Sequence, residues 1–385
     1  MACRWAIASS IPDDRMGPSE RAAWLRLLLT PGIGRTSARQ LLACFGSAES
    51  VWQVDRTAWA DCIGPAKAAA LAAPPPDWDT ELSRLETWLS HSTDRHMVAL
   101  GDGRYPNSLL ETPDPPLVLF VQGRVESLGQ TLALAVVGSR NPTPQGAEHA
   151  RRFAHALAEA GVSVVSGLAL GVDGEAHAGA LDGHGTTLAC VGTGLDRVYP
   201  ARHRDLAHRI AAQGAIVSEY PLGTPPLAAH FPQRNRIIAG LSQGTLVVEA
   251  ALQSGSLITA RLAADMGREV FAIPGSIHSP QSRGCHALIR QGAKLVESVE
   301  DILEELPGAQ AQTPKATSPA PVAAAGDDTD DALLRAMGHE PIGLEALQDR
   351  TGMPTAQLMA RLLELELAGC VGRLPGGRVQ RLVRA

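Results

Sequence analysis

The chain has 385 residues, of which 45% are hydrophobic and 19% are charged, and its formal net charge is −6. This length supports two or three domains with well-supplied cores. The negative charge excludes capture of a polyanion by global attraction, so a nucleic-acid site must concentrate its positive charge locally. The cysteines form no CxxC pair and the histidines show no metal-ligand spacing, so we expect no metal site and no cofactor.

The sequence gives no sign of membrane targeting. A run of about 18 apolar residues, which a membrane span requires, does not occur. Trp5–Ser10 is too short and too polar for a signal peptide. Scattered cysteines fit a reducing compartment, so we expect a cytoplasmic protein.

Residues 20–72 predict short helices joined by tight turns. Gly32–Gly34 precedes one of these helices, and a weaker copy of the turn lies at Cys62–Lys67. Two interpretations are open: a helix-hairpin-helix whose backbone N–H groups meet a DNA phosphate, or a plain helix–helix turn in a small bundle. Pro74–Pro76 marks a boundary. We therefore expect residues 1–75 to form a helical domain of the SAM or helix-hairpin-helix type.

Strands and helices then alternate from Leu132 onward. Leu132–Val137 is a continuous apolar run, typical of a buried parallel strand. Thr143 is expected to cap the following helix, with Pro144 at its first position. The alternation predicts an α/β fold for residues 76–306, with a doubly wound, mostly parallel sheet and ligands at the carboxyl ends of its strands. The expected strands are 117–121, 132–137, 162–165, 186–191, 215–218, 245–249 and 269–273.

The last part of the chain changes composition twice. Residues 307–328 are rich in proline, alanine and threonine, which predicts a linker. Residues 329–385 predict three helices followed by a hairpin with a Pro375-Gly376-Gly377 turn. Three helices and a hairpin are the pattern of a winged-helix domain.

Gly138, Ser139 and Arg140 follow the first strand of the predicted parallel sheet. Gly138 permits a sharp turn, and Ser139 together with the first N–H groups of the next helix can bind a phosphate. Arg140 can hold the same phosphate bidentately. The alternative is a strand-to-helix turn that carries a surface arginine.

Gly167 and Gly171 follow the next strand, with Asp173 placed to cap the helix after it. The spacing Gly167-x3-Gly171-x2-Gly174 resembles a dinucleotide fingerprint only loosely. A phosphate cradle and a structural turn are both open here. His177 is expected to be a packed or capping histidine and not a catalytic one.

The strongest local signal lies near residue 231. It consists of an aromatic residue, Phe231, followed by Arg234, Asn235 and Arg236, all just before a predicted helix. An aromatic ring can stack a base of any sequence, and arginines can neutralise the backbone. In the alternative, Phe231 fills the core and one arginine pairs with Glu219 or Glu249. We expect at least one of the two arginines to have that structural role.

Two further segments are candidates for phosphate contact. Ser254, Gly255 and Ser256, with Thr259 one turn later, place hydroxyl and N–H groups at a helix start, although Ser256 is equally a simple cap. Arg202 lies beyond the third strand and either flanks a groove or begins a solvated helix.

Taken together, these motifs resemble the DNA-processing protein A family, also called Smf or DprA. The matching stretches cover roughly residues 96–305 in the family's order: 137–140, 166–173 with His177, 192–200, 218–221, 231–242, 254–263, 272–275 and 284–293. The first and last parts of the chain also look like the family's helical and winged-helix domains.

The resemblance implies an extended Rossmann-like core that binds single-stranded DNA. It implies protection of incoming strands and loading of the RecA recombinase during natural transformation, by a homodimer that is not an enzyme. Ser139 and Arg140 would hold phosphate, Phe231 would stack a base, and residues 234–236 would line the same pocket. Leu288 and Ile289 would lie near the surface for the dimer partner and RecA. The winged helix would contact duplex DNA or another protein.

One departure from the family concerns Leu227–Ala229, where some relatives carry a lysine, so affinity would depend more on the arginines. The alternative function is a nucleotide hydrolase of the lysine-decarboxylase-like (LOG) group, which this chain resembles around Gly244-Thr245 and Glu249. Those enzymes need two glycines where this chain has Ser242-Gln243, and Glu249 alone does not supply both acid and base. A dehydrogenase would need the dinucleotide glycine fingerprint, which is missing.

Overall fold

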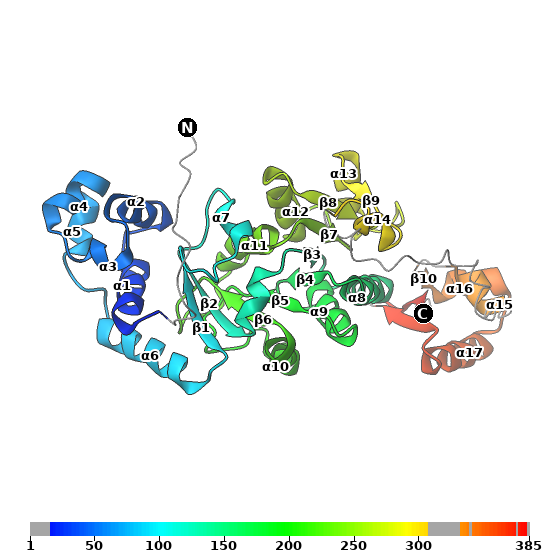
Figure 1. Cartoon of the computed structure of the whole chain (residues 1–385). Coiled ribbons are helices and arrows are strands. Elements are labelled where there is room, and N and C mark those ends of the chain that lie inside the picture. Colours follow the sequence, from blue (N-terminus) through cyan, green and yellow to red (C-terminus); the bar gives the residue numbers. More distant parts are fainter. Residues whose placement is uncertain (1–15, 307–331, 339–340, 375, 383–385) are drawn as a thin grey trace.

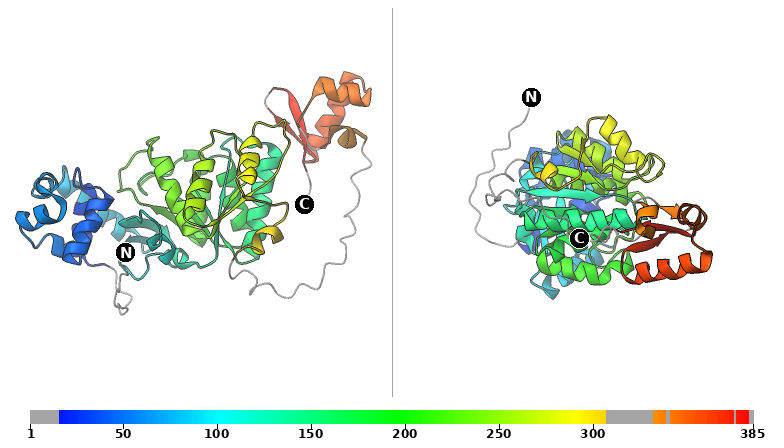
Figure 2. Two further views of the ribbon diagram at one scale, coloured as in Figure 1. Left: turned by 90° about the horizontal axis from the view of Figure 1, so that it is seen from above. Right: turned by 90° about the vertical axis from the view of Figure 1, so that its right-hand side faces the viewer.

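The computed structural model describes residues 16–306, 332–338, 341–374 and 376–382. Three parts follow one another along an elongated molecule: a helical bundle, a central sheet covered by helices, and a small domain at the far end (Figure 1). A view from above shows the same order (Figure 2). The predicted linker 307–328 and residues 1–15 lie outside the described residues, and the domain boundaries stay predictions.

The bundle is built from short helices and shares its core with the sheet. Its helices are α1 (Pro18–Leu29), α2 (Arg35–Phe45), α3 (Ala48–Val51), α4 (Arg56–Ile63) and α5 (Pro65–Leu71), and α6 (Trp78–His91) leads to the sheet. Gly32 has φ +80°, a left-handed value that glycine adopts without strain. Trp24 and Leu41 belong to the same buried cluster as Phe120 of the sheet. The bundle is therefore packed onto the sheet, and contact of its Gly32–Gly34 turn with DNA stays a prediction.

The central sheet has nine strands among the described residues, in the order β1-β2-β6-β5-β4-β3-β7-β8-β9. Strands β3 to β9 run parallel, while β2 is antiparallel to both β6 and β1. The predicted α/β fold with a mostly parallel sheet is confirmed. Its strands are β1 (Arg95–Ala99), β2 (Val118–Gly123), β3 (Ala133–Val137), β4 (Ser163–Ser166), β5 (Thr187–Cys190), β6 (Ala215–Ser218), β7 (Gly244–Val247), β8 (Glu269–Ala272) and β9 (Lys294–Leu295).

Alternate residues of β3 face two different helical layers. Ala133, Ala135 and Val137 pack with α11 (His230–Leu241), α12 (Ser256–Asp265) and α13 (Arg283–Arg290). Leu134 and Val136 pack on the other face, with α8 (Pro144–Glu159) and α9 (Val172–Asp182). A strand buried on both faces needs an apolar residue at every position, which explains the unbroken run in the sequence. The smaller elements of this part are α7 (Asn107–Leu110), η1 (Val125–Gly129), η2 (Ala201–His203), α10 (Arg204–Gln213) and α14 (Glu300–Leu303).

The order of the strands fixes where a ligand is expected. From β3 the chain winds outward through β4, β5 and β6, and it then returns to β7 on the other side of β3. The direction of winding thus reverses between β3 and β7. Open parallel sheets bind their ligands at such a switch point, outside the carboxyl ends of the strands.

The small C-terminal domain has its own core and a three-stranded sheet in the order β10-β12-β11. The predicted winged-helix pattern is confirmed, and β10 is an addition to it. Gln380 Nε2 donates to Gln145 Oε1 at 2.9 Å, which links this domain to the start of α8. Its elements are α15 (Ala332–Met337), β10 (Ile342–Gly343), α16 (Leu344–Thr351), α17 (Thr355–Leu367), β11 (Val371–Leu374) and β12 (Arg378–Arg381).

Within the described ranges, no helix combines the length and the apolar character that crossing a membrane requires.

His177 is a packed histidine inside the sheet-and-helix core, as one of the two interpretations expected. Its Nδ1 lies 2.7 Å from the hydroxyl of Thr187, which in turn donates to the carbonyl of Val164. Because that hydroxyl proton is already used, Nδ1 must be the donor and Nε2 carries no proton. Nε2 is buried without a hydrogen-bond partner, and burial lowers the pKa of His177 to about 3.

We expect this histidine to make stability depend on pH. Its folded pKa of about 3 lies below the ordinary 6.5, so below pH 6.5 the unfolded chain binds a proton that the folded chain excludes. Unfolding free energy should therefore fall by up to about 1.4 kcal/mol per pH unit as pH decreases from 6.5. Urea unfolding between pH 5 and 7 should show a flatter dependence for His177→Gln than for wild type. The exposed His208 gives the control His208→Gln; equal slopes for all three proteins would contradict the assignment.

Candidate nucleic-acid interface

The loop after β3 is held from both sides, and Arg140 projects from it. Ser139 N donates to the carbonyl of Glu249 at 2.7 Å, and Ser139 Oγ accepts from Asn141 N at 3.1 Å. A Cβ on Gly138 would lie 2.7 Å from the Val172 side chain, so only glycine fits there. Gly138 and Ser139 therefore shape the loop, whereas Arg140 is exposed to solvent.

The N-terminus of α8 already holds an anion. Thr143 caps the helix as predicted, with its hydroxyl accepting from Gly146 N at 3.0 Å. The carboxylate of Glu249 accepts from Thr143 N at 2.9 Å and from Thr143 Oγ1 at 2.6 Å. The chain's own Glu249 therefore occupies the cap residue of this helix, and binding of a phosphate by the first N–H groups of the helix stays a prediction.

The glycines after β4 serve internal packing. A Cβ on Gly167 would lie 2.1 Å from the guanidinium of Arg234, and one on Gly171 would lie 2.4 Å from the Ser139 carbonyl. Asp173 does not cap α9 with its side chain, since it lies in the first turn of that helix. Its carboxylate instead accepts from Gly167 N and Ala169 N. The structure thus favours the structural turn over the phosphate cradle.

Arg234 is an internal residue. Only 3% of its surface is exposed, and its guanidinium donates to the carbonyl of Cys190. Its charge partner is the buried carboxylate of Asp173: burial raises the pKa of Asp173, and Arg234 acts in the opposite direction. A guanidinium in this position offers almost no surface to a phosphate. Arg234 instead stabilises, from inside the protein, the carboxyl edge of the sheet where β5 ends.

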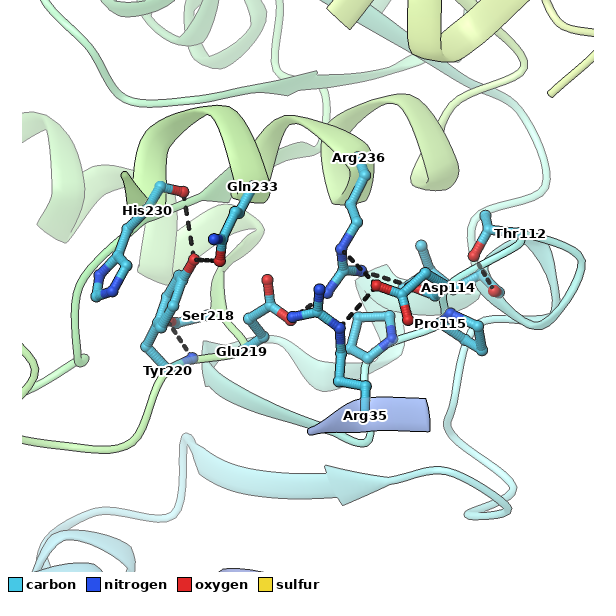
Figure 3. A network of polar contacts seen from close by, with 12 residues as sticks. Arg35, Thr112, Asp114, Pro115, Ser218, Glu219, Tyr220, His230, Gln233 and Arg236 are labelled. Atoms are coloured by element: carbon cyan, nitrogen blue, oxygen red, sulfur yellow. Dashed lines mark hydrogen bonds and ion pairs between the residues drawn. The ribbon is translucent and has the colours of Figure 1, made fainter. Parts of the chain in front are cut away.

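Arg236 belongs to an ion-pair network between the bundle and α11 (Figure 3). It pairs with Glu219 and donates to the carbonyl of Asp114, and 12% of its side chain is exposed. From α2, Arg35 reaches the Asp114 carboxylate at 2.7 Å and Glu219 at 3.4 Å, while Arg39 reaches Asp114 at 2.8 Å. Burial raises the pKa of Glu219, and Arg236 opposes this. The expectation that one arginine pairs with Glu219 or Glu249 is confirmed for Arg236.

Phe231 and Arg140 meet at the carboxyl edge of the sheet. The guanidinium carbon of Arg140 lies 5.4 Å from the centre of the Phe231 ring, within the range of a cation–π contact. Phe231 is only half-buried, so it does not simply fill the core. Tyr199, which the sequence did not single out as a site residue, lies beside it with a ring-centre distance of 5.7 Å. The available signal was its place five residues after the Gly192–Gly194 turn, in the loop that follows a predicted strand.

Helix α11 begins earlier than expected, so Phe231 and its polar neighbours lie inside the helix and not before it. Pro232 is tolerated there because the first turn of a helix has no internal N–H bonds to lose. Asn235 donates to the carbonyl of Gly255 at 3.3 Å, which joins α11 to the start of α12.

The hydroxyl turn before α12 is partly open. Ser254 Oγ lies 2.7 Å from Ser256 Oγ, and Ser256 is the first residue of the helix, after Gly255 as the cap. No atom lies within 4 Å of a Cβ built on Gly255, whereas Thr259 is only 1% exposed. Arg202, in η2, is exposed and lies in the loop that follows β5.

The structure therefore gathers most predicted residues at one edge: Gly138, Ser139, Arg140, Gly167, Gly171, Arg202, Phe231, Asn235, Ser254, Gly255 and Ser256. The described part of the chain holds no group of three or more His, Cys, Asp or Glu side chains suited to a metal ion. Leu288 and Ile289 lie on α13. Leu288 is 6% exposed and packs in the core, so it offers a partner little surface, while Ile289 is half-buried.

The fold and this edge define a Rossmann-like α/β protein with an aromatic and cationic site and an appended winged helix. A family model described as DNA recombination-mediator protein A matches residues 96–307, and one described as the DprA winged helix domain matches residues 316–377. The chain belongs to the DprA/Smf family.

Related proteins match much of the chain. Protein Smf of Escherichia coli strain K12 is 47% identical over 304 residues, which cover 77% of this chain and 80% of that protein. The DNA processing protein DprA of Streptococcus pneumoniae is 48% identical over 204 residues, or 53% of this chain and 72% of that protein. The X-ray structure of DNA processing protein A from Streptococcus pneumoniae matches with a TM-score of 0.65 at 36% identity, covering 76% of this chain and 99% of that one.

The packing of Gly167 against Arg234 predicts a loss of stability when a methyl group is added. Arg234 is enclosed and cannot move aside, so Gly167→Ala should reduce the free energy of unfolding by about 1–3 kcal/mol. Gly255→Ala is the matched control, since its φ of −61° and its open surroundings admit a Cβ. Its effect should stay within about 0.5 kcal/mol. Urea unfolding followed by tryptophan fluorescence would contradict this account if the two variants behaved alike.

Proposed function

We propose that this protein binds single-stranded DNA along the carboxyl edge of its sheet, without reading sequence. The observation that carries the proposal is the exposed Arg140 guanidinium set 5.4 Å from the half-exposed ring of Phe231. A cation beside an aromatic ring suits one nucleotide, because the cation attracts the phosphate and the ring stacks the base. Neither contact depends on which base is present.

The remaining predicted residues fall into two groups, exposed residues that can contact DNA and buried residues that cannot. Arg202 and the open Ser254–Ser256 turn are proposed to contact the DNA backbone together with Arg140, and Asn235 is placed between that turn and Phe231. Arg234 and Arg236 are proposed to act indirectly. The hydrogen bond of Arg234 to Cys190 and the ion pair of Arg236 with Glu219 fix the first turns of α11 and thereby the position of Phe231.

We propose a non-catalytic protein. The hydrolase alternative would use Glu249, and both oxygens of that carboxylate accept hydrogen bonds from Thr143. A carboxylate whose two oxygens are both engaged in this way is poorly placed to take a proton from a substrate or water. Release of free base from nucleotides by the pure protein would overturn this part of the proposal.

Family membership supports a role in the processing and recombination of incoming DNA, and we propose that the protein loads RecA onto the strand as a homodimer. The surface around Ile289 on α13 is the proposed contact for the second copy and for RecA. The winged helix is proposed to bind either duplex DNA or a protein partner.

Arg140→Ala should weaken the binding of oligothymidine and lower the salt slope of the affinity by about one, because one phosphate contact is lost. Fluorescence anisotropy with a labelled oligonucleotide over a series of salt concentrations measures both quantities. Arg152→Ala, which removes an exposed arginine from the middle of α8, should change neither. An unchanged slope for Arg140→Ala would remove this residue from the site.

Phe231→Ala should cost about 1–3 kcal/mol of binding free energy and leave the salt slope unchanged, since it removes a stacking surface and no charge. The same anisotropy titration gives the result, and circular dichroism gives the thermal unfolding midpoint. A variant that no longer folds would show instead that Phe231 is needed to fill the core.

A further inference from the structure

Tyr199 stands beside Phe231 and presents a second aromatic surface. Its side chain is 46% exposed, although most large apolar residues of this chain are buried. The two rings are 5.7 Å apart and inclined by 37°, so Tyr199 covers only part of the Phe231 ring. An exposed aromatic ring that touches the proposed stacking ring adds a second surface on which a base can stack.

The loops that follow β3, β4 and β5 are joined into one continuous edge. The backbone of Gly171, after β4, lies against the backbone of Arg140, after β3. His203, after β5, makes a hydrogen bond of 3.0 Å through Nδ1 with the carbonyl of Leu168, after β4. These contacts hold Tyr199 and Arg140 in one rigid surface, although they come from different strands.

Leu170 lies in the loop after β4, the strand between the two whose loops carry Tyr199 and Arg140. It precedes Gly171, which touches Arg140, and it is 38% exposed. Neighbouring strands of a sheet are about 4.8 Å apart, so the loops that follow β5, β4 and β3 are displaced from one another by about that distance along the edge. Exposed apolar and cationic side chains therefore lie beyond the ends of all three strands: Tyr199 and Arg202 after β5, Leu170 after β4 and Arg140 after β3.

We propose that Tyr199 is a second base-stacking residue, with Leu170 in contact with the same strand, so that the DNA crosses the ends of β5, β4 and β3. This inference rests on the proposed function, and it adds the direction of the strand and a second base subsite. The exposed Arg140 and Arg202 supply the charge complementary to the phosphates between these bases.

The test uses the full chain and labelled oligothymidine in anisotropy titrations. Tyr199→Ala should weaken binding about 5- to 150-fold with an unchanged salt slope, and Tyr199→Phe should restore it, because stacking needs the ring and not the hydroxyl. Leu295→Ala removes a residue of similar exposure (44%) from the edge strand β9 and should leave the affinity unchanged.

A double mutant separates direct contact from support of Phe231. If Tyr199 stacks its own base, Tyr199→Ala weakens binding again in the Phe231→Ala background. If Tyr199 only positions Phe231, it has no further effect there, and the inference is overturned. Photo-crosslinking with oligonucleotides that carry 5-iododeoxyuridine should place a crosslink on Tyr199 itself, and a crosslink confined to other residues also counts against it.

Failure of this inference is distinguishable from failure of the proposed function. Wild type that ignores oligothymidine at low salt refutes both. Wild type that binds, loses affinity through Phe231→Ala and keeps it through Tyr199→Ala refutes only the second base subsite. Equal thermal unfolding midpoints for the variants exclude misfolding as the cause.

Discussion

The site depends on ion pairs that the molecule buries beneath it. Arg234 and Arg236 lie in the first turns of α11, where Asp173 and Glu219 respectively supply the opposite charge. A buried charge is costly unless it is paired and hydrogen-bonded, and removing one partner of such a pair is strongly destabilising. These pairs therefore allow few positions for α11. Phe231 stands at the start of this fixed helix, and its position relative to Arg140 follows.

Pairing of positive groups with the chain's own carboxylates also decides which positive groups stay available to bind a ligand. The chain carries a net charge of −6, and its carboxylates neutralise the very features that usually attract anions. Glu249 occupies the start of α8, and Glu219 and Asp114 hold Arg236. Attraction for a polyanion is thus confined to exposed side chains such as Arg140. Concentrating the positive charge in a few exposed groups is how an acidic protein can bind nucleic acid locally.

Local patterns in the sequence predicted the fold well, and contacts between distant segments explain what they missed. The unbroken apolar run of β3 and the Thr143 cap are properties of adjacent residues, and both are confirmed. Strand β1 was not predicted, because only three of its five residues are buried and its hydrogen bonds come from β2. The roles of Arg234 and Arg236 depend on partners in other elements, 44 residues away for Arg234 and up to 122 residues away for Arg236, which no local motif encodes. A basic residue next to an aromatic one resembles a binding motif in the sequence, because the sequence does not show whether its charge is already paired with a carboxylate.

The network around Arg236 also changes how the helical bundle is understood. Arg35 and Arg39 come from α2, yet their carboxylate partners Asp114 and Glu219 lie in the sheet domain, and both of those partners also pair with Arg236 of α11. Figure 3 shows Arg35 and Arg236 meeting at these two carboxylates. The buried apolar cluster that joins Trp24 to Phe120 crosses the same boundary. A module that hung loosely from the sheet would share neither a core nor buried charges with it, because both require fixed geometry. The bundle is thus part of the framework that positions the edge where Phe231 and Arg140 meet, whatever its own turn at Gly32–Gly34 contacts.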